Sequence, residues 1–441
     1  MRRGTGPGAG RRLIALRNEI RRYAWGSATD IPQMLGIEPT GEPAAEMWIG
    51  AHPDSPSRAL PAPGDPASPA ADATGPAEAD AAESGDAPTL PELIAADPRG
   101  MLGAEVLARF GPELPYLLKL LAASAPLSLQ THPTIEQARE GYAAEDAEGV
   151  PPGAAHRSYL DRNHKPELLC ALTPFEALCG FRPVEEAARF LHAAAGSGAG
   201  ALRGVAARLV AEGGLRDVVT WLLTLPAPEQ AALAGAAHTA CARLRRAPGQ
   251  WREDADLIVR LAGLYPADPG VVLAMLLNHV RLAPGEAIYL AAGQIHTYIA
   301  GFGVELMASS DNVLRAGFTA KHINIPALLR TVVCEPTAAR LIAPTPSAAP
   351  GELRYLSPAE DFALSRLDLA AGQSALLEGI GPSLVLCVAG QARLRIGDEA
   401  LRLTPGRAAF AAAGSDLRIE GPGSAFRATA GEPAERQGGA G

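Results

Sequence analysis

Gln130 and His132 stand two residues apart in segment 127–133, an otherwise apolar stretch that reads LSLQTHP. Side chains alternate between the two faces of a strand, so both residues share one face with Ser128. An amide oxygen and an imidazole on one face can bind a metal ion, or they can simply line a polar surface. These residues alone leave both possibilities open.

Two more residues of the same chemical kind lie at the ends of predicted strands. Glu167 heads the apolar segment 167–172, where a carboxylate is costly unless it is paired or binds a metal. His296 follows the Ala-Ala-Gly turn 291–293, next to a predicted strand. Two imidazoles, a carboxylate and an amide oxygen suit a divalent borderline metal, most often Zn²⁺. Most of the remaining histidines, including His52 in a loop, are interpreted as structural.

These residues sit on a predicted frame of strands that a helical block interrupts. Short strands are expected before residue 183, and apolar residues at three- and four-residue spacing predict five or six helices over 184–279. The strand pattern returns after Pro284 and runs to about Arg427. Residues 61–90 are rich in Pro, Ala and Asp without an aromatic residue, which predicts a mobile loop.

An internal repeat supports this layout. PGEAIYLAAGQIHTYIAG (284–301) and PGRAAFAAAGSDLRIEG (405–421) align without a gap over a turn, a strand, a second turn and the start of another strand. His296 of the first copy corresponds to Leu417 of the second. If His296 only filled the core, Leu would serve in both places, so we infer that the first copy holds a site and the second keeps the scaffold.

Bulk composition narrows the class of protein. The 441 residues are 47% hydrophobic, which suits several folded units, and the net charge of −9 argues against a nucleic-acid surface. No run of about 18 apolar residues predicts a membrane span. The basic start, MRRGTGPGAGRR, lacks the apolar stretch of a secretory signal. Five scattered cysteines without CxxC spacing indicate buried thiols in a reducing cytoplasm.

Several motifs together resemble a known family. Residues 285–296 are similar to the second cupin signature, with Ala291 where Pro is usual and Ala300 where an asparagine is usual. More specifically, the chain resembles type I phosphomannose isomerase, the mannose-6-phosphate isomerase family. The stretches that carry the resemblance are YAWGS (23–27), LSLQTHP (127–133), DRNHKPELLCALTPFEALCGF (161–181), residues 284–324 and the helical block.

The resemblance implies a zinc enzyme with one Zn²⁺ per chain. The family's ligand positions are filled here by Gln130, His132, Glu167 and His296, and its catalytic arginine matches Arg315 in Asn312-Val313-Leu314-Arg315-Ala316-Gly317. The implied reaction interconverts mannose 6-phosphate and fructose 6-phosphate through a cis-enediol. Zinc would act as the Lewis acid, and a neutral Gln ligand would leave it more positive than a third anion would.

Other residues have roles that the sequence does not rank. His164 and Asp311 are the leading candidates for ring opening or proton transfer, and Glu305 is a third. Lys165 and Lys321 are candidate partners for the phosphate or an oxyanion, although a solvated Lys321 is also open. Ser128 is expected to line the substrate pocket.

The predicted fold class is mainly β with an α-helical insertion, as two cupin-like jelly-roll barrels plus a helical domain. The predicted domains are a catalytic cupin domain (1–183 and 280–335), a helical insertion (184–279) and a degenerate cupin-like domain (336–430). The partner is a phosphorylated hexose, with no nucleic acid or membrane, and we expect a cytoplasmic monomer. The alternatives are a non-catalytic metal-binding cupin that binds a sugar or regulates, and, less favoured, an Fe(II) cupin oxygenase.

Overall fold

The computed structural model describes residues 12–61 and 87–433. Most of the expected mobile loop 61–90 and the Arg-rich residues 1–11 therefore lie outside the described residues. The end of that loop prediction is corrected at Leu90, which begins helix α2, because Thr89 forms a capping box with Glu92. Among the described residues no helix has the length and apolar character needed to cross a membrane.

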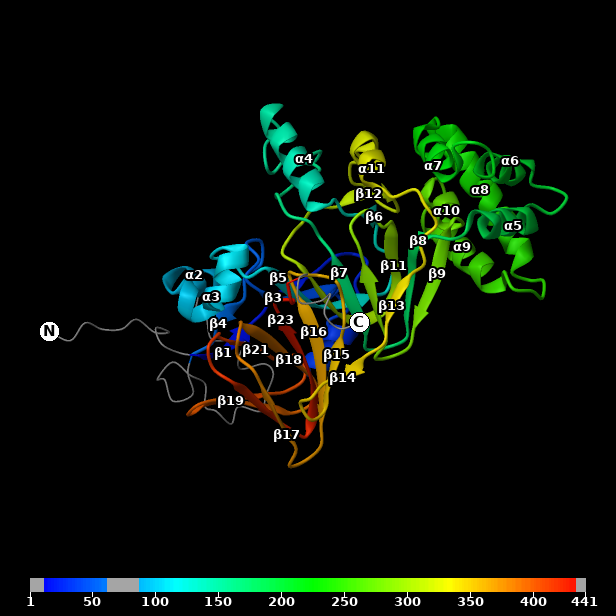
Figure 1. The fold of residues 1–441 in the computed structure, drawn as a ribbon. Coiled ribbons are helices and arrows are strands. Elements are labelled where there is room, and N and C mark those ends of the chain that lie inside the picture. The colour runs from blue at the N-terminus through cyan, green and yellow to red at the C-terminus, as the bar shows by residue number, and fades with distance from the viewer. Residues whose placement is uncertain (1–11, 62–86, 434–441) are drawn as a thin grey trace.

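The strands of the described residues form three sheets (Figure 1). The eleven-stranded sheet contains β2 (Ile20–Arg21), β3 (Glu46–Gly50), β5 (Tyr116–Ala123), β6 (Leu129–Thr131), β7 (Glu167–Ala171), β8 (Phe175–Phe181), β9 (Leu277–Leu282), β10 (Ala287–Leu290), β11 (His296–Ala308), β12 (Leu314–Gly317) and β13 (Arg340–Ile342). The eight-stranded sheet contains β1 (Leu13–Arg17), β4 (Arg58–Ala59), β14 (Thr345–Pro346), β15 (Glu352–Tyr355), β16 (Ala363–Leu369), β18 (Ser383–Gly390), β21 (Ala408–Ala411) and β23 (Gly423–Thr429). The four-stranded sheet contains β17 (Ser374–Leu377), β19 (Ala392–Ile396), β20 (Glu399–Leu403) and β22 (Leu417–Glu420).

The predicted class, sheets with a helical insertion, is confirmed, but no closed barrel forms among the described strands. The predicted helical block contains α5 (Val184–Ala195), α6 (Gly200–Leu209), α7 (Gly214–Thr224), α8 (Ala227–Leu244), α9 (Arg252–Leu264) and α10 (Gly270–Ala274), which lie together to one side of the sheets (Figure 1). The other helices are α1 (Asp30–Leu35), α2 (Leu90–Ala96), α3 (Pro98–Phe110), α4 (Ile135–Ala147) and α11 (Ile325–Thr331).

The core is layered between these sheets. One apolar cluster packs the eleven-stranded sheet against the eight-stranded sheet, with Leu118 and Leu306 meeting Leu384 and Phe426. A second cluster fills the space between the eight- and four-stranded sheets. The helices α5 to α10 pack in a third cluster. Each of the four residues named here is fully or almost fully buried, as expected for strands that are apolar on both faces.

The internal repeat is confirmed as a repeat of secondary structure. Strand β10 and strand β21 occupy equivalent residues of the two copies, and β11 begins at His296 where β22 begins at Leu417. The turn glycines that precede the strands have positive φ in both copies, +89° at Gly285 and +78° at Gly406. The equivalent of a site histidine is thus a buried leucine in an equivalent local fold.

Strands from both ends of the chain pair in a sheet formed mainly by the other predicted domain, and the domain boundaries stay a prediction. Strand β1 lies in the eight-stranded sheet, between β21 and β4, although residues 1–183 were assigned to the catalytic domain. Strand β13 pairs with β10 in the eleven-stranded sheet, although residues 336–430 were assigned to the C-terminal domain. These pairings join strands about 50 residues apart (β10 and β13) and almost 400 residues apart (β1 and β21), which local patterns do not reveal.

Strand β11 connects the two parts of the eleven-stranded sheet that carry site residues. It pairs with β6 and β8 at His296, and from Gly301 onward it pairs with β5 and β7. Gly301 has φ +132°, and a Cβ there would lie 2.6 Å from the Phe175 ring, so a larger residue would strain the bend. Strand β11 thus carries both His296 and Glu305, on either side of the irregularity between Tyr298 and Ala300.

Candidate metal centre and active site

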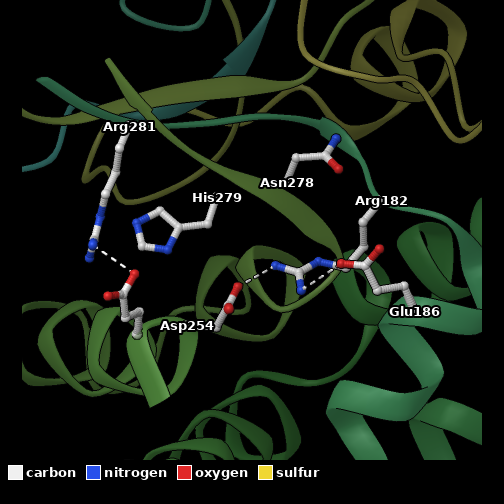
Figure 2. A pocket seen from close by; sticks show the side chains of 7 residues that line it. Arg182, Glu186, Asp254, Asn278, His279 and Arg281 are labelled. Atoms are coloured by element: carbon white, nitrogen blue, oxygen red, sulfur yellow. Dashed lines mark hydrogen bonds and ion pairs between the residues drawn. The ribbon is translucent and has the colours of Figure 1, made fainter. Parts of the chain in front are cut away.

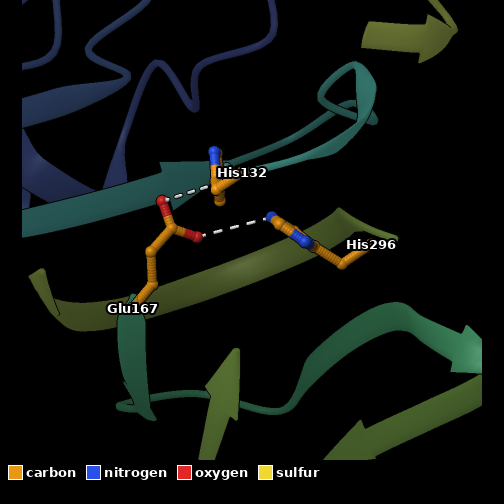
Figure 3. A group of neighbouring side chains, drawn as sticks. All are labelled: His132, Glu167 and His296. Carbon is orange, nitrogen blue, oxygen red and sulfur yellow. Dashed lines mark ion pairs between the residues drawn. The ribbon is translucent and has the colours of Figure 1, made fainter. Parts of the chain in front are cut away.

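Three predicted ligands, His132, Glu167 and His296, lie together, and we call them the metal-site trio (Figure 3). The Nε2 atom of His132 is 3.3 Å from one carboxylate oxygen of Glu167, and the Nε2 atom of His296 is 3.4 Å from the other. The three residues are 0%, 2% and 1% exposed. They come from the end of β6 and the first residues of β7 and β11.

Hydrogen bonds to the backbone determine which ring nitrogens of the trio face Glu167. The Nδ1 atom of His132 lies 2.8 Å from the carbonyl oxygen of Asn312, and that of His296 lies 2.9 Å from the carbonyl oxygen of Gln294. A carbonyl only accepts, so each Nδ1 carries a proton and the other ring nitrogen, Nε2, is the one turned toward Glu167. This is the arrangement in which carbonyls orient metal-binding imidazoles.

The metal-site trio contains buried polar atoms that lack a partner, and a bound cation would supply one. Both Nε2 atoms and one oxygen of Glu167 are buried and have no hydrogen-bond partner among the described residues. Burial lowers the pKa of His132 to about 4, against the opposing pull of Glu167, so at neutral pH the ring is not an imidazolium. Two lone pairs and a carboxylate directed at one buried point fit a divalent metal with nitrogen and oxygen ligands.

Gln130 lies next to the trio in the sheet. It is paired with His296 of β11 on one side and with Arg315 of β12 on the other. Its Oε1 atom accepts a hydrogen bond from the hydroxyl of Ser128 at 2.9 Å, so the predicted shared face of Ser128 and Gln130 is observed. Ser128 thus orients an amide that was predicted as the fourth ligand.

Asn312 holds the loop that supports His132. Its side chain is fully buried, and its amide group hydrogen-bonds the backbone of Leu160, Asp161 and Asn163, at 2.7 Å from the amide nitrogen of Leu160. The carboxylate of Asp161 in turn accepts from the amide of Asp311 at 2.7 Å. On the other side of His132, Thr134 forms a capping box with Gln137 that starts α4.

The predicted lysine and arginine partners take different positions. Lys165 is buried, and its ammonium group lies 3.3 Å from Glu167. Burial raises the free energy of the charged Glu167, but His132 and Lys165 keep the pKa of this carboxyl well below its usual value. Arg315 is half-buried, and burial lowers the pKa of its guanidinium. Partial burial and the charge of Arg315 lower the pKa of Lys321, as expected for two cations that lie near each other.

Glu305 belongs to a buried charge cluster that the sequence interpretation did not include. The ammonium group of Lys119 lies 3.6 Å from Glu305 and 3.7 Å from Glu46, and 4.6 Å above the ring of Trp48. Burial and the charge of Glu167 raise the pKa of Glu305 to about 7, against the opposing effect of Lys119. A lone lysine inside the apolar strand YLLKLLAA was the signal that could have identified this cluster.

The two leading proton-transfer candidates have unexpected partners. The Nε2 atom of His52, interpreted as a loop histidine, lies 3.3 Å from a carboxylate oxygen of Asp311, and His52 is buried. His164 contacts Asp361, with its Nε2 atom 2.8 Å from the carboxylate. Neither pairing has a local sequence signal, because the partners are far apart in the chain.

A cavity of about 280 Å³ lies elsewhere, between the helical block and β9, and none of the predicted site residues lines it (Figure 2). Its charges are paired with each other: Arg182 contacts Asp254 at 2.7 Å, and Arg281 contacts Glu253 at 2.7 Å. The side chain of Asn278 donates to three backbone carbonyls. These contacts join the helical block to the sheet, and we assign the cavity no catalytic role.

Comparisons with known proteins agree with this metal centre. The family described as phosphomannose isomerase type I, catalytic domain, matches residues 13–64 and 66–184, and the mannose-6-phosphate isomerase cupin domain matches residues 351–429. Mannose-6-phosphate isomerase of Escherichia coli is 38% identical over 413 residues, which cover 93% of this chain and 97% of the relative. The enzyme of Aspergillus fumigatus is 31% identical, with 93% of this chain and 94% of the relative covered.

A solved structure is similar over nearly the whole chain. The mannose 6-phosphate isomerase of Salmonella typhimurium, bound to fructose 6-phosphate and zinc, has a TM-score of 0.82 and 36% identity, and the match covers 96% of this chain and 100% of that one. A cupin with a buried site for a divalent metal is the class that the fold and the trio define. The chain belongs to the type I phosphomannose isomerase family.

Proposed function

We propose that the protein is a zinc-dependent mannose-6-phosphate isomerase, which interconverts D-mannose 6-phosphate and D-fructose 6-phosphate. The observation that carries this function is the metal-site trio, with buried, unbonded donor atoms directed at one point. Membership of the family, together with the zinc and fructose 6-phosphate bound by the Salmonella relative, supports the isomerase over a non-catalytic cupin.

The metal would be held by His132, Glu167 and His296, with Gln130 as the fourth ligand. One Zn²⁺ per chain would supply a Lewis acid that stabilises negative charge on the sugar oxygens next to the reacting carbons. The oxygenase alternative is disfavoured, because such an enzyme has no need of Arg315 and Lys321 as a pair of cations for a phosphate or an oxyanion.

The protein's own residues then divide the remaining tasks. Arg315 and Lys321 bind the phosphate or the developing enediolate. Asp311, paired with the buried His52, and His164 assist opening of the sugar ring. Glu305 is the residue whose pKa, raised to about 7, best matches a base that moves a proton between C2 and C1. Lys165 helps to keep the buried Glu167 ionised, and Lys119 opposes the rise in the pKa of Glu305.

The larger architecture belongs to the same proposal. Two cupin-like units are favoured by the repeat, the first with the metal and the second, within the cupin match at 351–429, without a metal-binding histidine at Leu417. The helical insertion at 184–279 and the predicted boundaries 1–183, 280–335 and 336–430 remain part of this proposal. A monomer in the cytoplasm remains a prediction.

One assay tests the function directly. Purified protein should form fructose 6-phosphate from mannose 6-phosphate, lose this activity on chelation and regain it with Zn²⁺. A chain that binds zinc tightly but does not convert the sugar would instead be the non-catalytic cupin. Activity that is indifferent to chelation would contradict the metal-dependent mechanism.

A further inference from the structure

One contact joins the C-terminal part of the chain to the segment that carries the site. The Nε2 atom of His164 lies 2.8 Å from an Oδ atom of Asp361. Asp361 stands between β15 and β16 of the eight-stranded sheet, within the region of the cupin match, whereas His164 stands just before β7 of the eleven-stranded sheet. The contact therefore bridges two sheets.

Asp361 is well placed to fix the histidine. Its side chain is 8% exposed, and the next residue, Phe362, is fully buried in the core between the two sheets. A buried carboxylate held by its backbone in this way is costly without a partner. His164 is that partner. Its ring is bonded to Asp361 through Nε2, while 30% of the side chain remains exposed to solvent.

The direction of the hydrogen bond determines what the ring can do. A carboxylate accepts, so Nε2 of His164 carries the proton and donates a hydrogen bond to Asp361. Nδ1 is then the nitrogen that remains for proton exchange, and among the described residues no hydrogen bond to Nδ1 is formed. A carboxylate that orients an imidazole in this way is a recurring device in proton-transfer enzymes.

The contact also lies beside the metal-site trio along the chain. Lys165, which follows His164, contacts Glu167 at 3.3 Å, and Glu167 is the first residue of β7. Anchoring His164 therefore anchors the segment that presents both Lys165 and Glu167. On the other side of the segment, Asn163 donates its side-chain amide to the carbonyl of Ser309.

From these contacts we infer that Asp361 is a positioning residue for the active site, contributed by the C-terminal unit. It holds His164 in one tautomer and orientation, so that the second cupin-like unit takes part in the reaction in addition to its role as a scaffold. This inference rests on the proposed isomerase function, in which His164 assists ring opening.

The same interface offers a matched control. Tyr355 also belongs to the eight-stranded sheet, and its hydroxyl donates to the carbonyl of Gly285 at 3.0 Å and accepts from the thiol of Cys170 at 3.2 Å. Tyr355→Phe removes contacts between the same two sheets without touching His164. It separates loss of docking from loss of positioning.

The experiment uses the full-length, zinc-loaded protein and compares Asp361→Asn, Asp361→Glu and Tyr355→Phe. We expect Asp361→Asn to lower kcat by about 10- to 100-fold, with little change in KM or zinc content, as is typical when an orienting partner is lost. Asp361→Glu should recover part of kcat. Tyr355→Phe should lower Tm and leave kcat within about twofold of the unmodified protein, since it only loses docking contacts.

A double-mutant cycle and a spectrum complete the test. In the His164→Ala background, Asp361→Asn should have no further effect on kcat, because the two residues act as a unit. The ¹⁵N resonances of the imidazole, assigned by their absence in His164→Ala, should show a protonated Nε2 that Asp361→Asn changes.

An unchanged spectrum in Asp361→Asn, or an equal loss of kcat in Tyr355→Phe or in the His164→Ala background, would overturn the inference. An unmodified protein without isomerase activity would refute the proposed function instead, and the spectrum would still decide whether Asp361 orients His164.

Discussion

Arg315 of β12 lies directly opposite Gln130 of β6 in the antiparallel pairing, and Gln130 in turn lies opposite His296 of β11. Residues opposite each other in a sheet direct their side chains to the same face. The pairing thus aligns a predicted catalytic cation, a predicted amide ligand and a member of the metal-site trio in one row. This register places Arg315 in one row with two of the residues proposed to bind the metal.

Replacing Arg315 should therefore affect turnover far more than metal binding. We expect Arg315→Ala to lower kcat roughly 100- to 1,000-fold, because a preorganised donor to developing negative charge is lost. Arg315→Lys should recover only part of this, since an ammonium group lacks the planar fork. Steady-state kinetics and zinc analysis on the same samples measure both effects. Full turnover in Arg315→Ala would remove Arg315 from the mechanism.

His296→Leu should abolish zinc binding without unfolding the protein. The second repeat already has Leu417 at the equivalent position, where it is buried at the start of β22. The control is Leu417→His, which should not create a zinc site, because neither group of metal-binding side chains found among the described residues lies at that position. Zinc content by elemental analysis and the circular dichroism spectrum provide the measurements. If His296→Leu lost its fold, a structural role for His296 would be supported.

Asn312→Ala should weaken zinc binding although Asn312 is not a ligand. Its side chain holds the segment 160–163, and its carbonyl oxygen orients the His132 ring. We expect zinc affinity to fall about 10- to 100-fold. Asn278→Ala is the matched control, because Asn278 also hydrogen-bonds the backbone of three residues but lies in β9, next to the helical block. Competition with a zinc chelator and thermal unfolding of both variants distinguish metal affinity from stability. Equal zinc affinity in the two variants would contradict this prediction.

The pH dependence of kcat should report Glu305. Burial and the charge of Glu167 raise the pKa of Glu305 to about 7, and a base works only when ionised, so activity should fall as pH decreases through this range. Bound zinc would offset the charge of Glu167, so the acidic limb of the loaded enzyme should lie at or below pH 7. Glu305→Gln should remove this limb along with most activity. A limb that persists unchanged in Glu305→Gln would assign it to another group.

Glu176, at the contact between the eleven-stranded sheet and the helical block, should make the free energy of unfolding depend on pH in the acidic range. Burial opposes its charge, but hydrogen bonds from His279 and Arg260 lower its pKa from 4.5 to about 2. Because the folded pKa is the lower one, the stabilisation is present above pH 4.5 and is lost as pH falls toward 2. With Arg260 partly exposed, Glu176→Gln should cost about 1 kcal/mol at pH 7, a cost that shrinks below pH 4.5. Urea unfolding at both pH values measures this. A difference independent of pH would rule out the linkage.

Local patterns singled out residues that the structure brings together where these residues lie on strands next to turns. The alternation around Gln130 and His132 and the unequal histidine of the repeat both correspond to real positions at the metal-site trio. The alternation depends on neighbours two residues away and the repeat on similarity between two stretches of the chain, and the sequence displays both directly. The helical block was predicted for the same reason, because its apolar spacing is local.

The partners from distant parts of the chain could not be predicted in this way. Lys119 contacts Glu46 and Glu305 from two neighbouring strands, and Asp361 of one sheet contacts His164 beside another. Each pairing depends on strand order and register, and no short-range spacing encodes them. His52 appeared to be a loop histidine because its contact with Asp311 depends on the fold as a whole.

The position of β1 between β4 and β21 has a consequence for how the chain is made. A ribosome releases Leu13–Arg17 early, but the strand that borders it, Ala408–Ala411, emerges almost four hundred residues later. During that interval β1 lacks its neighbour β21, and an unpaired strand edge favours association with other nascent chains. Synthesis of this protein is thus almost finished before β1 can pair with β21.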